Sequence, residues 1–397
     1  MFAGWSALRS RTGGPMGRLM WSVGFAYTAM GIVLTALPLH LRHALGAGDT
    51  MVGAIMGAQA LVAVLMRPFG AAWAERRGYR LIMVLGAACL AAANAPYLVP
   101  RTVWLLGAAR MVTGLGEAFV FTAGGAWVLA LASAERRGRS IALFGLALWG
   151  GYTVGPLVGE MLAHRGGLAA AGMGGVAFAA LSAAIALSLR GVRPAARTDE
   201  SVPLFPRAVL RPGVTFALAA LGYAALSTFA ALHFAARGWG GGARPLVAFG
   251  VTFLLTRWLG AGLPDRMGSI RVAVGGALVE ACGLLLFAAA DTPWVALGGA
   301  LVIGAGFALA YPALALVAVN AVPASHRGAT LGAFTSFWDI ALAVGAPLSG
   351  ALTAWGGGGA PFVGGAVCAL AAAGLAALLG AAPLGRGARE PMLDEGD

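Results

Sequence analysis

Long apolar stretches alternate with short polar segments along the whole chain. Each stretch can cross the roughly 30 Å hydrocarbon layer of a bilayer as a helix. The ten-residue alternation of transmembrane β-strands is absent. The pattern predicts an all-α membrane protein with twelve transmembrane helices, at residues 19–42, 50–74, 80–99, 103–133, 140–163, 167–189, 213–236, 244–263, 271–290, 293–321, 327–353 and 359–382.

The polar segment that follows the second span recurs after the eighth, 190 residues later. The first copy reads Arg67-Pro-Phe-Gly-Ala-Ala-Trp-Ala-Glu75-Arg76-Arg-Gly78, and the second reads Arg257-Trp-Leu-Gly-Ala-Gly-Leu-Pro-Asp265-Arg266-Met-Gly268. The same offset relates Gly114 to Gly304, Phe144 to Phe334 and Gly155 to Gly345. A constant offset indicates two copies of one unit, and internal repeats in membrane chains are typical of transporters. We expect two pseudo-symmetric six-helix halves, at residues 19–189 and 213–382.

Composition supports a bilayer environment. Hydrophobic residues make up 59% of the chain and charged residues 11%, whereas soluble proteins carry about 25% charged residues. The net charge of +12 could indicate nucleic acid. However, the basic residues are all arginines, in short clusters between the spans, which is the pattern of a topology signal. We therefore expect lipid contacts and no nucleic-acid partner.

Nineteen of the 27 arginines fall on the side that also holds both termini, and five fall on the other side. The positive-inside rule then places both termini in the cytoplasm. An N-terminal segment (1–18), a Pro- and Arg-rich linker (190–212) and a C-terminal tail (383–397) should be cytoplasmic. Cys89, Cys282 and Cys368 lie within apolar spans, so no structural disulfide is expected.

The repeated loop resembles a hallmark of the major facilitator superfamily, Gly-x-x-x-Asp-Arg-x-Gly between helices two and three. Here it reads Ala71-x-x-x-Glu75-Arg76-x-Gly78, followed by Arg80. Ala71 replaces the Gly, Glu75 replaces the Asp, and Tyr79 stands where a basic residue is common. The charge pair is nevertheless kept.

Two further motifs resemble the same family. Helix four carries Arg110-x-x-x-Gly114-x-Gly116, and helix five carries Gly151-x-x-x-Gly155-Pro156-x-x-Gly159, which resembles a pattern that proton-coupled exporters favour. The resemblance covers about residues 16–382 and is strongest to a subfamily of uncharacterised, efflux-like bacterial transporters. It implies a central cavity, alternating access, a small-molecule substrate, a monomer and a bacterial inner-membrane location.

The resemblance also implies a cytoplasmic gate at the repeated loops. In this interpretation the acids form an inward-side latch with helix N-termini and with arginines across the two halves, and anions near helix N-termini are stabilising. The alternative is a tight loop with positive-inside arginines. The gate residues are Arg67, Glu75, Arg76, Gly78, Arg80, Arg257, Asp265, Arg266 and Gly268.

The small residues of helix five, Gly151, Gly155, Pro156 and Gly159, share one helix face. Small residues allow close helix approach in membranes. We expect this face to contact a helix of the other half and to form a rocking seam that favours export. The alternative is ordinary helix packing, which an importer would share.

Ionisable side chains inside the spans cost about 2.5–3.5 kcal/mol each on insertion scales and usually serve function. Arg110 and Glu117 lie two turns apart on one face of helix four, which the resemblance places at the cavity. A carboxyl group removed from water holds its proton more firmly, so this pair could bind substrate or carry the proton. The alternative is a buried pair that only locks helices together. Asp339, mid-span in helix eleven, is a second proton or cation candidate, whereas Glu280 is expected to hydrogen-bond between helices.

His40 and His233 end helices one and seven, at corresponding points of the repeats. They could sense pH or touch substrate at the outer mouth, or they could be hydrated helix ends. The sequence shows no phosphate-binding loop, no metal-ligand cluster and no catalytic arrangement. We therefore expect no metal and no cofactor, with an ion gradient as the driving force and protons as the expected ion.

Three functions remain open at this point. The first is proton-coupled efflux of a small organic molecule. The second is proton-coupled uptake of a sugar, amino acid or organic acid, in which Arg110 would bind a substrate carboxylate. The third is a receptor or scaffold without transport, which the short loops disfavour.

Overall fold

The computed structural model describes residues 14–133, 136–192, 207–323 and 326–381. Within these residues the secondary structure is helical. Most of the predicted N-terminal segment, linker and tail lies outside the described residues. α8 begins at Arg207, earlier than the predicted residue 213, and Pro212 lies inside that helix rather than in the linker.

The first half contains six crossings. α2 and α3 together form the first crossing, and the long α7 forms the fifth and sixth, because the chain turns at Gly166 and Gly167, where φ of Gly167 is +64°. The elements are α2 (Pro15–Gly31), α3 (Val33–His43), α4 (Asp49–Arg77), α5 (Tyr79–Asn94), η1 (Ala95–Leu98), α6 (Val103–Leu131) and α7 (Arg137–Ser188).

The second half repeats this plan. α9 is continued by the short α10, and α12 and α13 together form the tenth crossing. The elements are α8 (Arg207–Ala236), α9 (Arg244–Leu259), α10 (Leu263–Met267), α11 (Ser269–Ala288), α12 (Pro293–Phe307), α13 (Ala310–Asn320), α14 (Arg327–Gly356) and α15 (Ala360–Ala381).

In the described chain, ten helical stretches are long and apolar enough to cross a membrane. The break in α7 divides one of them into two crossings, and the 16-residue α9 supplies the remaining one. The twelve predicted crossings are therefore confirmed.

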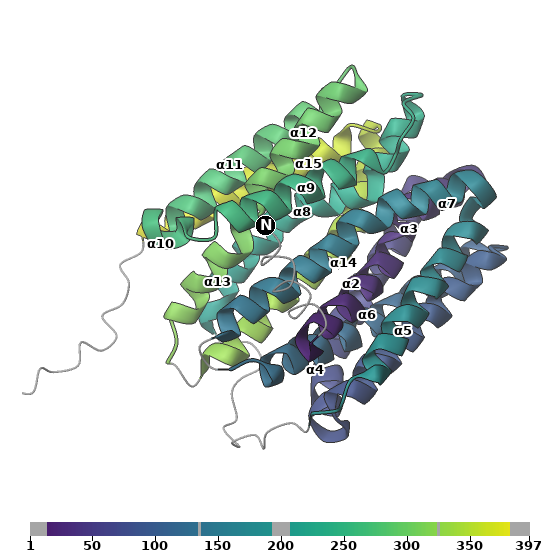
Figure 1. Cartoon of the computed structure of the whole chain (residues 1–397). Coiled ribbons are helices and arrows are strands. Elements are labelled where there is room, and N and C mark those ends of the chain that lie inside the picture. The colour runs from purple at the N-terminus through teal and green to yellow at the C-terminus, as the bar shows by residue number, and fades with distance from the viewer. Residues whose placement is uncertain (1–13, 134–135, 193–206, 324–325, 382–397) are drawn as a thin grey trace, which may run out of the picture.

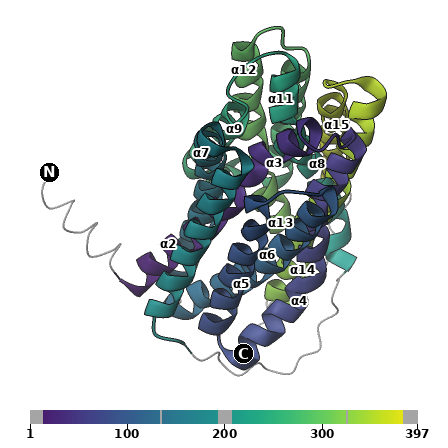
Figure 2. The same cartoon turned by 90° about the vertical axis from the view of Figure 1, so that its right-hand side faces the viewer.

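The two halves lie side by side, as Figures 1 and 2 show, with α4 and α14 in contact between them. The 190-residue offset is visible in local structure. Thr102 and Thr292 both cap a helix N-terminus through their side chains, as neutral hydroxyl caps commonly do. The sequence repeat is thus a structural repeat.

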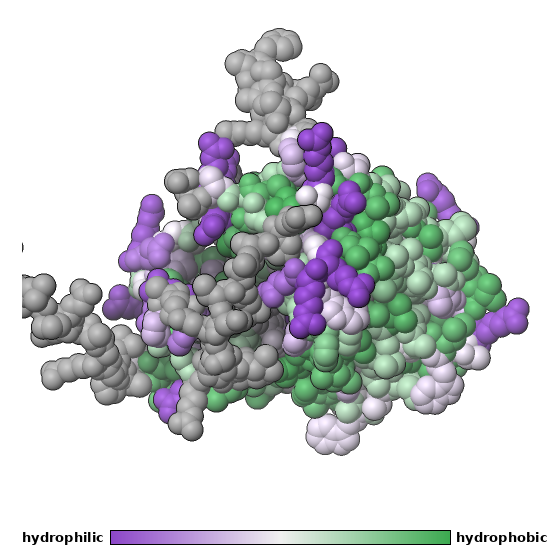
Figure 3. All heavy atoms as spheres, turned by 90° about the horizontal axis from the view of Figure 1, so that it is seen from below, coloured by the Kyte–Doolittle hydropathy of each residue, from purple (hydrophilic) through white to green (hydrophobic). Residues whose placement is uncertain are grey.

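The bundle has two chemically different ends. We call the end with the turns after α4, α6, α9 and α13 the arginine-rich end, and the other the arginine-poor end. Trp104 and Trp294, which the repeat relates, are 77% and 76% exposed at the arginine-poor end, as in the aromatic belt of a membrane interface. Figure 3 shows hydrophilic side chains standing out from a largely apolar surface.

Gly78 and Gly268 close the two repeated loops with φ of +92° and +89°. Side chains other than Gly are strained in this region by about 1–3 kcal/mol. We expect Gly78→Ala and Gly268→Ala each to lower the free energy of unfolding by that amount. Thermal unfolding of the purified protein checks this, with Gly138→Ala, at a helical glycine with free space around it, as the control. Equal stability of all three variants would contradict the prediction.

Candidate functional site

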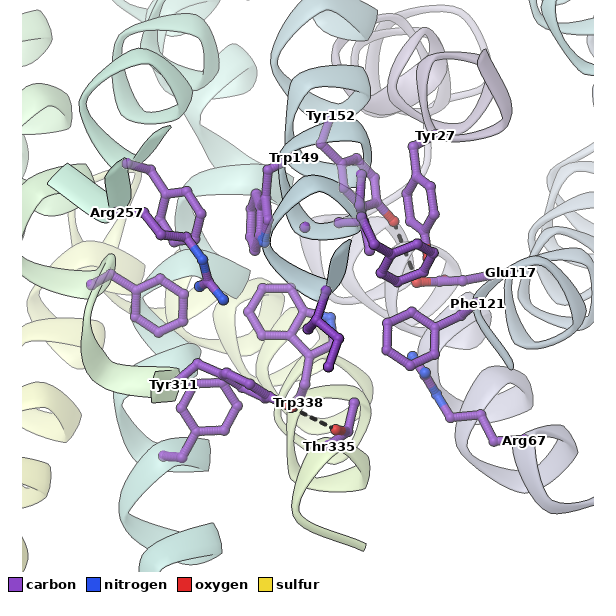
Figure 4. Close-up of a pocket in the computed structure, with 17 residues that line it drawn as sticks. Tyr27, Arg67, Glu117, Phe121, Trp149, Tyr152, Arg257, Tyr311, Thr335 and Trp338 are labelled. Carbon is purple, nitrogen blue, oxygen red and sulfur yellow. Dashed lines mark hydrogen bonds between the residues drawn. The ribbon is translucent and has the colours of Figure 1, made fainter. Parts of the chain in front are cut away.

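A central cavity lies between the halves, in the part of the bundle nearer the arginine-rich end (Figure 4). It holds about 820 Å³ of empty space, a figure that includes the solvent at its open mouth. Its walls are mostly aromatic, and its charged residues are Arg67, Glu117 and Arg257. The other lining residues are Tyr27, Phe121, Ile141, Phe144, Gly145, Leu148, Trp149, Tyr152, Phe216, Phe253, Phe307, Tyr311, Thr335 and Trp338.

The two halves contribute different chemistry to this cavity. The second half supplies a cluster of stacked rings, including Phe216, Phe253 and Phe307. Trp149 of α7 reaches into that cluster from the first half, with its ring centroid 4.2 Å from that of Phe253 and 5.5 Å from that of Trp338. The repeat is therefore symmetric in its backbone but not in its side chains.

Arg67 and Asp339 form an ion pair that joins the two halves. The Arg67 Nη2 donates to Asp339 Oδ1 at 2.8 Å, and Arg67 Nε contacts Asp339 Oδ2. The two side chains are 9% and 1% exposed. The Arg67 guanidinium also lies 4.1 Å from the ring centroid of Phe121. We predicted one residue as part of the gate and the other as a proton site, and the structure brings them together.

Glu117 lies where the central cavity meets a smaller one. The smaller cavity extends toward the arginine-poor end and shares Glu117, Tyr152 and Trp338 with the central one. Gln59 Nε2 donates to Glu117 Oε2 at 2.6 Å, and the Tyr152 hydroxyl donates to Glu117 Oε1 at 3.4 Å. The carboxyl group therefore faces both cavities.

Arg110 lines the smaller cavity and is 3% exposed. Its Nη2 donates to the Met56 carbonyl at 3.4 Å. Among the described side chains, Arg110 and Glu117 form no ion pair. Any influence of Arg110 on that acid is thus through space across the cavity.

The two histidines line neither of these cavities. The ring of His233 is buried between Phe287 and Phe362, and its Nδ1 lies 3.0 Å from the Gly358 carbonyl. This contact ties the end of α8 to the α14–α15 turn, which favours a packing role. His40 is half-buried near the end of α3.

The remaining gate residues lie at the surface of the arginine-rich end. Glu75, Arg76 and Arg80 are exposed and line a surface pocket beside Gly191. Asp265 and Arg266 are exposed on α10. The latch role of these loop residues stays a prediction, while Arg67 and Arg257 lie deeper, in the central cavity.

The prediction that the small face of helix five contacts the other half is wrong. A Cβ at Gly155 would lie 2.6 Å from Gly31 Cα, and Gly159 approaches the Ile32 carbonyl. Gly151 and Pro156 likewise contact α2 of the same half. Small residues predict close approach, but the helix that approaches is decided by the bundle.

The close contact between the halves instead uses α4 and α14, at the arginine-poor end. A Cβ at Gly57 would lie 2.8 Å from Pro347 Cδ, while Gly53 and Gly350 approach the carbonyls of Ala346 and Asp49. On the opposite flank Gly250 of α9 packs against Thr153 of α7. The bundle is therefore tightly packed at this end.

Sequence reasoning missed Gln59 and the glycines of α4. The spacing Gly53-x-x-x-Gly57 is a small-residue signal that could have revealed the α4–α14 contact. Gln59 is a polar residue within an apolar span, and this was a second signal in the sequence that could have identified it. In the described part of the chain, no three His, Cys, Asp or Glu side chains gather as a metal site.

Comparison with known proteins agrees with this architecture. The sequence profile of the Major Facilitator Superfamily matches residues 19–346 and 246–392. The chain is 34% identical over 367 residues to the uncharacterized MFS-type transporter YhhS of Escherichia coli (strain K12), covering 89% of this chain and 87% of YhhS. It is 32% identical to the MFS-type transporter STM4428 of Salmonella typhimurium, covering 89% and 93%.

Solved structures share the fold at low sequence identity. The human organic anion transporter MFSD10 has a TM-score of 0.68 and 18% identity, covering 91% of this chain and 98% of that one. A POT family transporter in complex with a thioalcohol-conjugated peptide has a TM-score of 0.75 and 14% identity, covering 92% and 96%. Because the family profile and the bacterial relatives match most of its length, the chain belongs to the major facilitator superfamily and is a secondary transporter, not an enzyme.

Proposed function

We propose that the protein is a proton-coupled exporter of a small organic molecule, with Glu117 as the group that binds and releases the proton. The observation that carries this proposal is that Glu117 lines both the central cavity and the smaller one. Alternating access requires a site that communicates with each side in turn. A single carboxyl group between two cavities meets that requirement.

The partners of Glu117 suit both of its protonation states. The amide of Gln59 donates to the ionised carboxylate, and after rotation its oxygen can accept from the protonated acid. The other titratable or charged groups that act on or near this carboxyl are Tyr27, Tyr152, Tyr223, Arg67, Asp339 and Arg110. Gln59 can therefore form a hydrogen bond with either form of the acid.

The Arg67–Asp339 ion pair links the charge state of the cavity to the contact between the halves. Protonation of Asp339 would remove the attraction that holds α4 to α14 at this depth. A change of a few kcal/mol is enough to redistribute two access states. Export, rather than uptake, is supported by the Gly-x-x-x-Gly-Pro pattern of α7, which resembles that of proton-coupled exporters.

The proposal is tested in everted membrane vesicles with an acidified lumen and a fluorescent pH probe. An exported substrate added outside should release luminal protons in exchange. We expect a panel of organic acids, amines, amino acids, sugars and nucleosides to contain such a compound. Glu117→Gln should lower the initial rate of release at least tenfold, because an amide cannot carry the proton.

Glu280→Gln is the matched control, since Glu280 is equally buried in α11 but lines neither cavity. It should keep most of the rate. Full proton exchange in Glu117→Gln would remove Glu117 from this role. Substrate flux that is independent of the proton gradient would overturn proton coupling, and proton release only in right-side-out vesicles would overturn export.

A further inference from the structure

We propose that the substrate is a zwitterion with an aromatic or apolar middle, whose acidic group binds Arg257 and whose basic group binds beside Glu117. This inference rests on the proposed function, because it assigns the substrate class of the same cavity. Figure 4 shows Arg257 and Glu117 on opposite walls, with Trp149 and Trp338 between them.

The two repeats differ in what surrounds their equivalent arginines, Arg67 and Arg257. Arg67 and Arg257 are equivalent by the 190-residue offset, and so are the rings that they face, Phe121 and Tyr311. The guanidinium carbons lie 4.1 and 5.8 Å from the respective ring centroids. The position equivalent to Asp339, however, holds Trp149. Arg67 thus has a buried counter-ion, whereas the Arg257 guanidinium lies near the rings of Phe253 and Tyr311.

Arg257 lies in the cavity without an acid to neutralise it. Among the described residues it forms no ion pair, and its side chain is partly buried. Placing a cation in such a medium is costly unless it is paired. Arginine presents a planar set of donors that fits a carboxylate, phosphonate or sulfonate. An anionic group of the substrate would supply the missing partner.

Two hydroxyl groups extend this anion site. The Tyr311 hydroxyl and Thr335 Oγ1 lie 2.9 Å apart in a hydrogen bond, and both residues line the same wall of the cavity as Arg257. Thr335 Oγ1 also donates to the Leu331 carbonyl at 2.9 Å, so the Tyr311 hydroxyl is the donor that can turn its hydrogen toward an incoming oxygen anion. The wall is therefore rich in donors and holds no carboxylate.

The middle of the cavity suits a flat apolar body. The rings of Trp149 and Trp338 lie between the two charged walls, and Phe216, Phe253 and Phe307 complete the surface. Aromatic pairs prefer centroid separations of about 4.5–7 Å. An aromatic substrate could join this cluster without leaving a polar group unpaired.

The charges of the cavity sum to zero, which is why a zwitterion fits better than a simple anion. Arg67 is neutralised by Asp339, so Arg257 and Glu117 remain, with opposite signs. A substrate ammonium beside Glu117 requires the ionised carboxylate, so substrate binding would expel the proton. A simple anion would instead bind best to the protonated site, which would give symport rather than exchange.

The test uses triads of compounds that share one body, phenyl, indole or naphthyl. Each triad contains the amino acid, its methyl ester, which lacks the acid, and the deaminated acid, which lacks the amine. Calorimetry on the purified protein in two buffers of different ionisation enthalpy yields the Kd and the number of protons released. We expect at least one zwitterion to bind tenfold or more tightly than both relatives and to release a proton.

Arg257→Gln should abolish the preference for the zwitterion over its ester and keep the preference over the deaminated acid. Arg257→Lys should restore part of it. Arg271→Gln, which removes an exposed arginine of the same half, is the control and should change neither ratio. An unchanged zwitterion-to-ester ratio in Arg257→Gln, or no binding by any triad, would overturn the substrate assignment.

The same data separate the two proposals. A zwitterion preference that depends on Arg257, but without proton release, would leave the substrate class standing and overturn proton exchange. Proton-coupled flux of compounds that lack an acidic group, unaffected by Arg257→Gln, would leave proton exchange standing and overturn the substrate class.

Discussion

Replacing Asp339 by Asn is expected to lower the free energy of unfolding by about 3–5 kcal/mol, the cost of leaving one partner of a buried ion pair unpaired. Arg67 would keep its charge, because the guanidinium does not lose its proton in proteins. Its side chain is only 9% exposed, so water cannot replace the lost carboxylate. Thermal and urea unfolding of the purified protein measure this loss.

The double variant Arg67→Gln, Asp339→Asn should recover most of that stability, because no buried charge remains. The single variant Arg67→Gln should differ from Asp339→Asn in its response to pH. An orphaned Asp339 can take up a proton in the folded state, so the folded state would bind more protons than the unfolded state near neutral pH. Its stability should then rise as the pH falls, whereas that of Asp339→Asn should not.

These outcomes decide whether the ion pair acts as a unit. A double variant as unstable as the single variants would show that Arg67 acts through Phe121, which its guanidinium faces at 4.1 Å, more than through Asp339. A single Asp339→Asn variant of unchanged stability would contradict the burial argument itself.

Replacing Gly53 by Leu is expected to shift the protein toward a state open at the arginine-poor end. The Cβ alone would collide with the Ala346 carbonyl and approach Pro347 Cα within 3.1 Å, both backbone positions of α14. Backbone cannot move aside as a flexible side chain can. Each 1.4 kcal/mol by which the α4–α14 packing is weakened raises the ratio of the open to the closed state tenfold.

Accessibility of an engineered cysteine measures this shift. T228C, in a variant lacking Cys89, Cys282 and Cys368, places a thiol in the smaller cavity, at a residue that is 3% exposed. A membrane-impermeant maleimide added at the arginine-poor side should modify it at least tenfold faster when Gly53 is Leu. Transport should fall in parallel, because the closed state of that end becomes rare.

The control is Gly298→Leu, since Gly298 of α12 has free space where a Cβ would stand. It should leave both the labelling rate and transport close to those of the parent protein. Unchanged labelling of T228C with Gly53→Leu would mean that the α4–α14 contact does not close this end.

The two halves repeat in their backbone but differ in the side chains that they present to the central cavity. Backbone features such as the Thr102 and Thr292 caps are repeated in the two halves. The side chains of the cavity are not repeated: Glu117 corresponds to Phe307, and Asp339 to Trp149. We infer that the first half carries the proton chemistry and the second half most of the substrate wall.

The charged residues of the site were predictable from the sequence, but their partners were not. Arg67, Glu117, Asp339 and Arg257 stand out in the sequence because charges are costly in a bilayer. The partner of each depends on which helices meet. Helix periodicity placed Arg110 and Glu117 on one face of α6. In the structure, Glu117 instead forms hydrogen bonds with Gln59 of α4 and Tyr152 of α7, because these neighbouring helices bring their side chains within hydrogen-bonding distance.

The twelve crossings, the two repeated halves and the positions of the turns can be predicted from the amino-acid sequence, because a bilayer imposes the length and polarity of each helix locally. The arginine distribution likewise carries the predicted orientation. Which helix faces meet is visible only in the folded structure. It placed the small face of α7 against α2 and α3, and it joined Arg67 to Asp339 across 272 residues of sequence. In lipid, apolar faces pack against many alternatives equally well, so contacts between helices depend on the shape of the whole bundle.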